Sequence, residues 1–254
     1  MMTTAIMNMK GGTAKTISVI QTAAILYRQH GKHVLLIDAD SQANLSEFIV
    51  DEPENLKNAE GLCDLLCGGN VHGLLATKIP GAQLLPGDSS LMALDIAAMR
   101  GAGLKQNAIA DWLQNFPQFD HCLIDCPPAF NAAAMAALRA ADNVIIPVKL
   151  DAFGINGIAK ILEQIRNMQE VNPKLRTAGV LPTMYYRSET QEETEAQLQE
   201  VLGSIGVNVF SHIRRSSKVD ESTFEQRPLI DFSPKSGACK DYKRFVGEFL
   251  KWEV

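Results

Sequence analysis

Lys10-Gly11-Gly12-Thr13-Ala14-Lys15-Thr16 is the stretch that decides the fold of this chain. It follows a short apolar run and precedes a helix-like segment, which is the context of a phosphate-binding loop. Glycines there allow close backbone approach and positive φ, so successive N–H groups and the helix N-terminus can surround phosphate oxygens. We expect Lys15 to add charge on the outer phosphates and Thr16 to place its hydroxyl on a magnesium ion.

The same stretch departs from the common phosphate-loop pattern G-x-x-x-x-G-K-[ST]. Met9 and Ala14 occupy the positions of its two glycines. The pattern that does match is K-G-G-x-x-K-T, which has an additional lysine, Lys10, at its start. The stretch is therefore interpreted as a deviant phosphate loop.

Short apolar runs alternate with helix-like segments outward from this loop. Most runs are nearly continuous in apolar character, which is typical of strands covered on both faces of a parallel sheet. We expect strands at residues 5–8, 34–37, 83–85, 121–124, 143–148 and 177–181. We expect helices at residues 15–30, 91–115, 132–140, 155–170 and 190–205. This alternation predicts an α/β fold: a doubly wound, mostly parallel sheet with helices on both faces, in a single domain spanning residues 1–254.

Carboxylates stand where several of these strands end. Asp38 and Asp40 end one strand segment, Asp125 ends another, and Asp151 lies near the end of a third. Sheets of this class bind ligands outside the carboxyl ends of their strands, where the loops converge. The carboxylates are therefore expected to face the Gly-rich loop and to form a magnesium-nucleotide site.

The combined motifs resemble the ParA/MinD family of deviant Walker A ATPases, and most of all the ParA (Soj-type) partitioning ATPases. Residues 34–44 are similar to the family's second motif, which usually ends D-P-Q-x-N and here ends D-S-Q-A-N. Residues 122–128, C-L-I-D-C-P-P, resemble its Walker B strand. Further matches at residues 144–148, 179–185 and 233–238 extend the resemblance over nearly the whole chain.

The resemblance implies hydrolysis of ATP to ADP and phosphate, with ATP and Mg²⁺ as cofactors. It implies that Lys10 reaches across an ATP-dependent dimer to the partner's phosphates, where a cation offsets charge in the transition state. Catalysis is then assigned to Lys10, Lys15 and Asp40, with Asp40 orienting the attacking water. The magnesium site is assigned to Thr16, Asp38 and Asp125. The nucleotide-binding residues are Lys10, Gly11, Gly12, Thr13, Ala14, Lys15, Thr16, Ile17, Thr183 and Pro234.

Three positions depart from the family pattern. Ala14 replaces a frequent Gly, Ile17 replaces a frequent second Thr, and Ser41 replaces the usual Pro. None of these changes removes a charged participant. Ala14 is expected to strain a backbone position that prefers Gly, which would slow hydrolysis while leaving binding intact.

The resemblance also implies partners: a homodimer in the ATP state, nonspecific double-stranded DNA, and a ParB-like centromere-binding protein that stimulates hydrolysis. Arg214, Arg215 and Lys218 lie in the segment that resembles the family's DNA-contacting region. Phosphate contact needs such cations rather than base-reading groups. The alternative is a solvated charged turn. No helix-turn-helix extension is expected before the phosphate loop, so specific operator binding is not expected.

The last helical segment favours a competing interpretation. Apolar residues recur there at helical spacing beside three cations, which resembles a membrane anchor of a MinD-like positioning switch. The segment closely follows the 233–238 loop, where the ParA-like fold places its final packed helix. We therefore expect core packing of this helix and no membrane partner.

Composition sets the remaining limits. The chain has 254 residues and a formal net charge of −5, which argues against a generally basic nucleic-acid binder. Residues 211–254 nevertheless carry nine Lys and Arg against seven Asp and Glu, a local net charge of +2. No transmembrane stretch or signal segment is found, so we expect a cytoplasmic protein, associated with the nucleoid if the resemblance holds.

Overall fold

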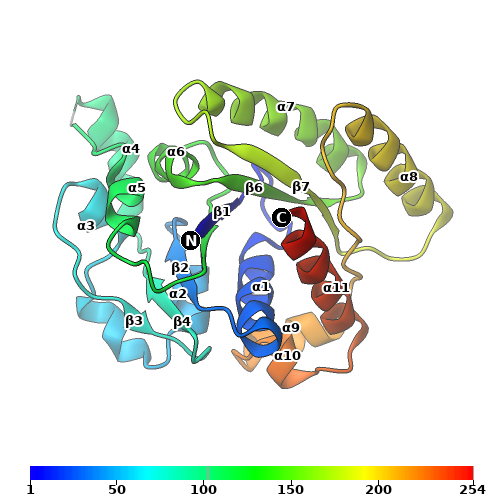
Figure 1. Cartoon of the computed structure of the whole chain (residues 1–254), viewed down its shortest axis with the longest axis horizontal. Coiled ribbons are helices and arrows are strands. Elements are labelled where there is room, and N and C mark those ends of the chain that lie inside the picture. The colour runs from blue at the N-terminus through cyan, green and yellow to red at the C-terminus, as the bar shows by residue number, and fades with distance from the viewer. Residues whose placement is uncertain (102, 254) are drawn as a thin grey trace.

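Within the residues that the structure describes, 1–101 and 103–253, seven strands of the computed structural model form one sheet (Figure 1). Its strand order is β3-β4-β2-β5-β1-β6-β7, and every neighbouring pair is parallel except β3 with β4. The strands are β1 (Met2–Ile6), β2 (Val34–Asp38), β3 (Leu75–Ala76), β4 (Ala82–Leu85), β5 (His121–Asp125), β6 (Asn143–Lys149) and β7 (Arg176–Thr183). This is the predicted α/β architecture.

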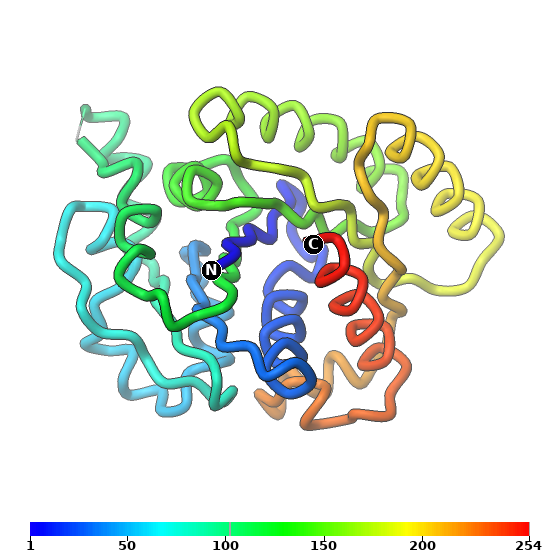
Figure 2. The backbone as a smooth tube through the Cα atoms, viewed as in Figure 1, coloured from blue at the N-terminus to red at the C-terminus, as the bar shows by residue number. Residues whose placement is uncertain are grey.

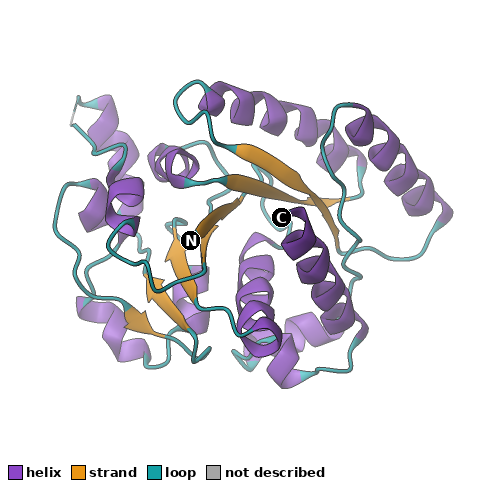
Figure 3. Ribbon diagram, viewed as in Figure 1, coloured by secondary structure: helices purple, strands orange, loops and turns teal. Residues whose placement is uncertain are grey.

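Helices cover both faces of the sheet (Figure 3). One buried cluster joins strand residues such as Leu36 and Leu123 to α1 and α11, and the other joins Leu35 and Ile124 to α6 and α7. The helices are α1 (Lys15–His30), α2 (Asn44–Ile49), α3 (Leu62–Leu66), α4 (Leu91–Met99), α5 (Ala108–Leu113), α6 (Ala132–Ala140), α7 (Ala152–Gln169), α8 (Glu189–Ser204), α9 (Ser217–Phe224), α10 (Leu229–Phe232) and α11 (Gly237–Trp252), with a 3₁₀ turn at Pro53–Asn58. The two-sided cover explains why the strand residues are nearly all apolar.

The strand register brings the predicted carboxylates to one edge. Asp38 is the last residue of β2 and lies beside Asp125, the last residue of β5. Asp125 also lies beside Ile6, the last residue of β1, from which the chain runs into the phosphate loop. The carboxyl ends of three neighbouring strands therefore meet around that loop.

The start of β1 and the end of α11 come to the edge of the sheet opposite the phosphate loop (Figure 2). Met2 pairs with His121 at the start of β5, and His121 Nδ1 lies 3.4 Å from Glu253 Oε1 just beyond α11. Phe245 and Phe249 of α11 are fully buried. The apolar face of this helix packs in the core, as the sequence analysis expected.

Two sequence predictions need correction. The helix expected at residues 91–115 is two helices, α4 and α5, because the segment between them contains Gly101 with φ +80° and Gly103. Ala102, which falls inside that predicted helix, lies outside the described residues. The first strand is Met2–Ile6 rather than residues 5–8, because the Asn8 side chain already belongs to the loop and accepts the N–H of Lys10 at 2.9 Å.

None of the described helices combines the length and the apolar character needed to cross a bilayer.

Candidate active site

The phosphate loop begins after β1 and ends at the N-terminus of α1, which no described side chain caps. Ala14, the residue before α1, is in the left-handed region with φ 65°, and no side chain in the described part of the chain caps the helix there. Gly12 also has a positive φ of 67°. These two residues with positive φ leave the N–H groups of the first turn of α1 pointing out of the helix end, where they can donate to an anion. The strained conformation predicted for Ala14 is therefore present.

Lys15 and Thr16 sit in the first turn of α1, directly above the end of β5. Thr16 Oγ1 donates to Asp125 Oδ2 at 2.6 Å, and the Lys15 ammonium folds back to the carbonyl of Lys10 at 3.3 Å. Lys15 is 7% exposed, and this burial lowers its pKa, although Asp125 and Asp40 act in the opposite direction. The structure thus brings together the lysine, hydroxyl and carboxylate that the motifs predicted.

Asp38 organises the segment that follows β2. Its Oδ2 accepts hydrogen bonds from the Ser46 N–H at 2.9 Å and hydroxyl at 2.8 Å, and its Oδ1 accepts from the Asp40 N–H at 3.1 Å. Asp40 is half-buried, lines the hollow over the loop and accepts from the Gln42 N–H at 3.0 Å. Both Asp38 oxygens are therefore engaged by residues 40–46, and a direct metal role for Asp38 stays a prediction.

The carboxylates at the strand ends are strongly desolvated. Burial raises the pKa of Asp38 to about 6, and burial together with the nearby Asp38 charge raises that of Asp125 well above its ordinary range. Asp125 Oδ1 is buried and has no hydrogen-bond partner among the described residues. Carboxylate and hydroxyl oxygens are the ligands that Mg²⁺ prefers, and a divalent cation would offset the buried negative charge. The residues present fit a magnesium ion at this point.

Lys10 lies at the other end of the loop and pairs within the same chain. Its Nζ is 2.9 Å from Asp151 Oδ1 and 3.1 Å from Asp151 Oδ2. Asp151 also caps α7, because its Oδ1 accepts the Gly154 N–H at 2.7 Å. The adjacency of β1 and β6 causes this contact, since each residue follows the carboxyl end of one of those strands.

Two adjoining hollows open beside the loop. The loop hollow, of about 600 Å³, is lined by residues 11–17, Asp40 and Asp220. The Thr183 hollow, of about 450 Å³, is lined by Lys149, Thr183, Tyr186, Arg215 and Asp220 among others. They share five residues: Ala14, Ile17, Met184, Val219 and Asp220. Together they form one elongated site that continues from the loop toward β7.

The two residues assigned to the far side of the nucleotide have different positions. Thr183 is buried, and its hydroxyl lies within hydrogen-bond distance of the Thr13 carbonyl at 3.1 Å and the Val148 carbonyl at 3.2 Å. It therefore ties β7 to the loop. Pro234 is exposed and is not among the residues that line either hollow, so its assignment stays a prediction.

Sequence reasoning missed three groups at this site. Lys149 ends β6 with its ammonium 4.0 Å from the point where a Cβ on Gly12 would lie, which places a third cation beside the loop. Tyr186 and Asp220 line the hollows. The position of Lys149 at a strand end, next to Asp151, was the available signal.

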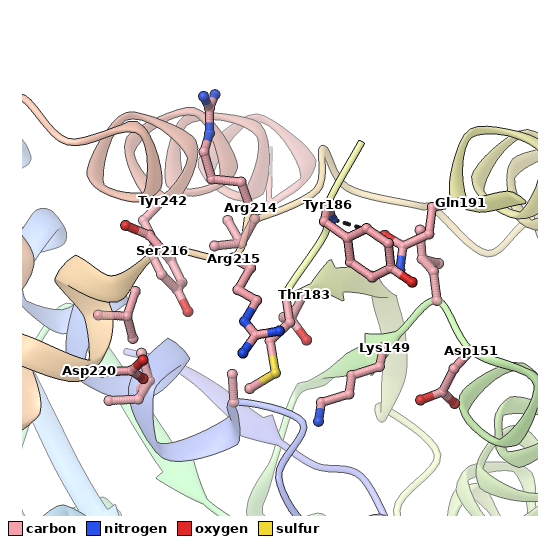
Figure 4. Close-up of a pocket in the computed structure, with 16 residues that line it drawn as sticks. Lys149, Asp151, Thr183, Tyr186, Gln191, Arg214, Arg215, Ser216, Asp220 and Tyr242 are labelled. Atoms are coloured by element: carbon pink, nitrogen blue, oxygen red, sulfur yellow. Dashed lines mark hydrogen bonds between the residues drawn. The ribbon is translucent and has the colours of Figure 1, made fainter. Parts of the chain in front are cut away.

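The three cations predicted for DNA contact point in different directions. Arg214 and Arg215 both line the Thr183 hollow, but Figure 4 shows the Arg215 guanidinium reaching into it while that of Arg214 points away. Arg214 Nε lies 2.6 Å from Oδ2 of the buried Asp241 on α11, and this ion pair raises the pKa of the arginine. Lys218 pairs with Glu221 at 2.5 Å on the surface of α9. Their contact with DNA stays a prediction.

Similar proteins were found by sequence and by structure. A family model described as an AAA domain matches residues 1–177. The chromosome partitioning protein ParA of Caulobacter vibrioides is 30% identical over 98% of this chain and 94% of its own length. The chromosome-partitioning ATPase Soj of Thermus thermophilus is 30% identical over 97% of this chain and 94% of its own length.

Among solved structures, cobyrinic acid a,c-diamide synthase from Mycobacterium smegmatis with a bound ATP analogue and magnesium has a TM-score of 0.81. It is 27% identical, and the match covers 98% of this chain and 94% of that chain. Likeness in sequence and in structure therefore extends over nearly the whole chain.

Proposed function

Because this chain belongs to the ParA family of ATPases, we propose that it is a DNA-partition switch that segregates plasmid, chromosome or mobile-element DNA. In the proposed cycle it binds ATP with Mg²⁺, forms a homodimer and then binds double-stranded DNA without sequence preference. A ParB-like partner stimulates hydrolysis and release. We assign this cycle to one domain, residues 1–254, acting in the cytoplasm on the nucleoid.

The observation that carries the nucleotide part is the contact of Thr16 Oγ1 with Asp125 Oδ2 beneath an uncapped helix end. A strand-end carboxylate, a first-turn hydroxyl and unpaired helix N–H groups converge within one hollow. This combination suits a magnesium-bound polyphosphate and little else.

Each residue then has a physical role. The loop N–H groups and Lys15 would hold the phosphates, with Thr16 and Asp125 holding the metal directly or through water. When bound, Mg²⁺ supplies charge neutralisation on the phosphate oxygens. Asp40 would orient the attacking water, and Asp38 keeps Asp40 in place by accepting its N–H. Thr183 would fix the loop against β7 while the remainder of the nucleotide extends along the Thr183 hollow.

Lys10 connects nucleotide state to assembly in this proposal. Its side chain is 37% exposed, and within the described part of the chain its ammonium forms one ion pair, with the 45% exposed Asp151. Such a pair contributes about 0–1 kcal/mol, so the phosphates of a second subunit can replace Asp151 as its partner. A cation delivered there would offset the charge that develops on the transferred phosphoryl group.

The experiment that tests the proposal measures binding to nonspecific duplex DNA with ATP, with ADP and without nucleotide. We expect salt-sensitive binding with ATP that persists in Asp40→Ala, because this variant traps the ATP state. Arg215→Ala should weaken binding, whereas Lys57→Ala, a matched loss of an exposed cation in the 3₁₀ turn, should not.

The same set of nucleotide states is applied to anionic vesicles. ATP-dependent vesicle binding without DNA binding would overturn the partition assignment in favour of a MinD-like positioning switch. DNA binding that is equal in all nucleotide states would also contradict the proposed cycle.

A further inference from the structure

A third hollow, of about 580 Å³, lies away from the nucleotide site between α6, α7 and the segment before α5. Figure 1 places α6 beside α4 and the adjoining end of α7. None of its lining residues lines the loop hollow or the Thr183 hollow. We call it the α6–α7 hollow. Its volume is within the range of clefts that bind ligands, about 300–1,000 Å³.

Each of the two helices presents a regular stripe to this hollow. From α6 the stripe is Ala132, Met135, Ala136 and Arg139. From α7 and the turn that follows it, the stripe is Gln164, Asn167, Met168 and Val171. Both sets have the spacing i, i+3, i+4, i+7, which is one face of a helix. The hollow is therefore an inter-helix groove of the kind that accepts the ridge of a third helix.

The floor of the groove is apolar and partly open to solvent. Met135 is 44% exposed and Val171 is 49% exposed, although both belong to residue types that normally pack inside. Phe130 and Met168 are half-buried in the same groove. Methionine side chains adapt to differently shaped partners, and the two alanines of the α6 stripe permit close approach of a backbone.

The charged side chains that line the groove have one sign. Among the described residues that line it, only Lys105 and Arg139 are charged, and none is a carboxylate. The Asp95 carboxylate lies just outside the lining, where its Oδ1 accepts the Ala132 N–H at 2.9 Å. Neither cation forms an ion pair in the part of the chain that the structure describes: the Lys105 ammonium lies 3.4 Å from the Gly68 carbonyl, and Arg139 lies 3.5 Å from Asn107 Oδ1. In a chain of net charge −5, a carboxylate-free groove with two available cations is complementary to an acidic ligand.

From these observations we propose that the α6–α7 hollow docks an amphipathic helix of a partner protein, with apolar residues on one face and carboxylates beside them. The apolar ridge packs between the stripes of α6 and α7, covering Met135 and Val171. The flanking carboxylates pair with Lys105 and Arg139, which set the orientation of the helix. Docking at this surface does not require nucleotide, since the groove contains no residue of the nucleotide site.

The test uses a synthetic peptide of about five helical turns, with Leu at i, i+3, i+4, i+7 spacing and Glu at the flanking positions. Fluorescence anisotropy measures its binding to the full chain. We expect binding with and without ATP, and about tenfold weaker binding of a second peptide in which every Glu is replaced by Lys. A third peptide of the same composition, with its Leu residues scattered, should also bind weakly.

Variants identify the surface. Arg139→Glu and Met135→Glu should each weaken binding of the acidic peptide about tenfold or more. Arg166→Glu is the matched control, because Arg166 is exposed on α7 but does not line the groove, and it should leave binding unchanged. Thermal unfolding of each variant establishes that it is folded.

Three results overturn the proposal. The first is equal binding of the Glu and Lys peptides, and the second is binding that none of the groove variants changes. The third is a change in the sedimentation coefficient of the chain alone in Met135→Glu, which would make a second copy of this chain the occupant.

Discussion

Lys10 and Asp151, which follow different strands, hold each other at the rim of the nucleotide site. Lys10 Nζ lies 2.9 Å from Asp151 Oδ1 and 5.6 Å from the centroid of the Phe153 ring, which is 80% exposed. Both contacts are on the surface, so they restrain the lysine without burying it. In the proposed dimer this pair must open before Lys10 can reach another subunit.

Asp151→Asn should therefore ease ATP-dependent assembly. The amide retains an oxygen for the Gly154 N–H but loses the charge that holds Lys10. An exposed pair is worth up to about 1 kcal/mol and two such pairs open in each homodimer, so we expect the protein concentration at half-association to fall by up to about 30-fold. Sedimentation with ATP measures this shift. Asp120→Asn, which removes a comparable exposed pair with Lys32, should leave association unchanged, and an unchanged value for Asp151→Asn would contradict the restraint.

The two loop lysines should separate binding from hydrolysis. Lys15→Ala should abolish binding of a fluorescent ATP analogue, because the buried ammonium above Asp125 is lost. Lys10→Ala should bind the analogue with nearly unchanged affinity but release phosphate about 10³-fold more slowly, the scale of a lost arginine finger. Normal hydrolysis by Lys10→Ala would remove this lysine from the proposed chemistry.

Ala14→Gly should stabilise the protein. Ala14 has φ 65°, where a Cβ is disfavoured, and this strain exceeds the extra entropy that glycine loses on folding. We expect the free energy of unfolding in urea to rise by about 0.5–1 kcal/mol. Ala159→Gly, an exposed site within α7, should lower it by about 1 kcal/mol instead. A decrease for Ala14→Gly would mean that the loop conformation is not strained.

The buried His121 and the half-buried Glu253 should have opposite effects on the pH dependence of stability. Burial lowers the pKa of His121 to about 4 and raises the pKa of Glu253 to about 7. On acidification from about pH 6.5 to 4, the unfolded imidazole gains a proton that the folded one excludes, so His121 reduces stability. Glu253 reduces stability as the pH rises from about 4.5 to 7, because its folded carboxyl keeps a proton that the unfolded one releases.

These two effects nearly cancel in the wild type, because between the two pKa values the folded pair and the unfolded pair each hold about one proton. Glu253→Gln removes the effect of Glu253 and leaves that of His121. We expect its free energy of unfolding to fall on acidification from pH 6.5 to 4, with a slope steeper than the wild type's by up to about 1.4 kcal/mol per pH unit. Urea unfolding across this range measures the slope. A Glu253→Gln profile parallel to the wild type would show that the two groups do not titrate as stated.

Arg214 and Arg215 should differ in their effect on folding. Among the described residues, Arg214→Ala leaves Asp241, which is 2% exposed, with only the Arg214 N–H and a long contact to Arg244, so we expect a loss of about 1–3 kcal/mol in stability. Arg215→Ala removes an exposed side chain over the hollow and should change stability by less than about 0.5 kcal/mol. Thermal unfolding of the two variants makes the comparison, and equal stabilities would contradict a structural role for the Arg214–Asp241 pair.

The parts of the fold that were predictable have strong local signals. The strand, loop and helix around Lys15 follow each other within residues 2–30, although the strand begins three residues before its expected start. The helix expected at residues 155–170 is α7, which begins three residues earlier, at Ala152, where Asp151 caps it. The break between α4 and α5 was missed because apolar residues on both sides of Gly101 continue a helical pattern across it. Helical periodicity records which residues avoid water, and a turn of a few residues changes it too little to be seen.

By itself, the sequence determined which chemical groups stand at the carboxyl ends of the strands. Lys15, Thr16, Asp38 and Asp125 belong to short segments whose local order fixes their place, since parallel strands joined by helices end at one edge. Only the tertiary structure decided the partners of Lys10, Arg214 and Thr183. Asp151, Asp241 and Thr13 are far from them in sequence and come within reach because β1 lies beside β6, β6 beside β7, and α11 packs beneath them. Such contacts depend on strand order and helix docking, which no local pattern of residues encodes.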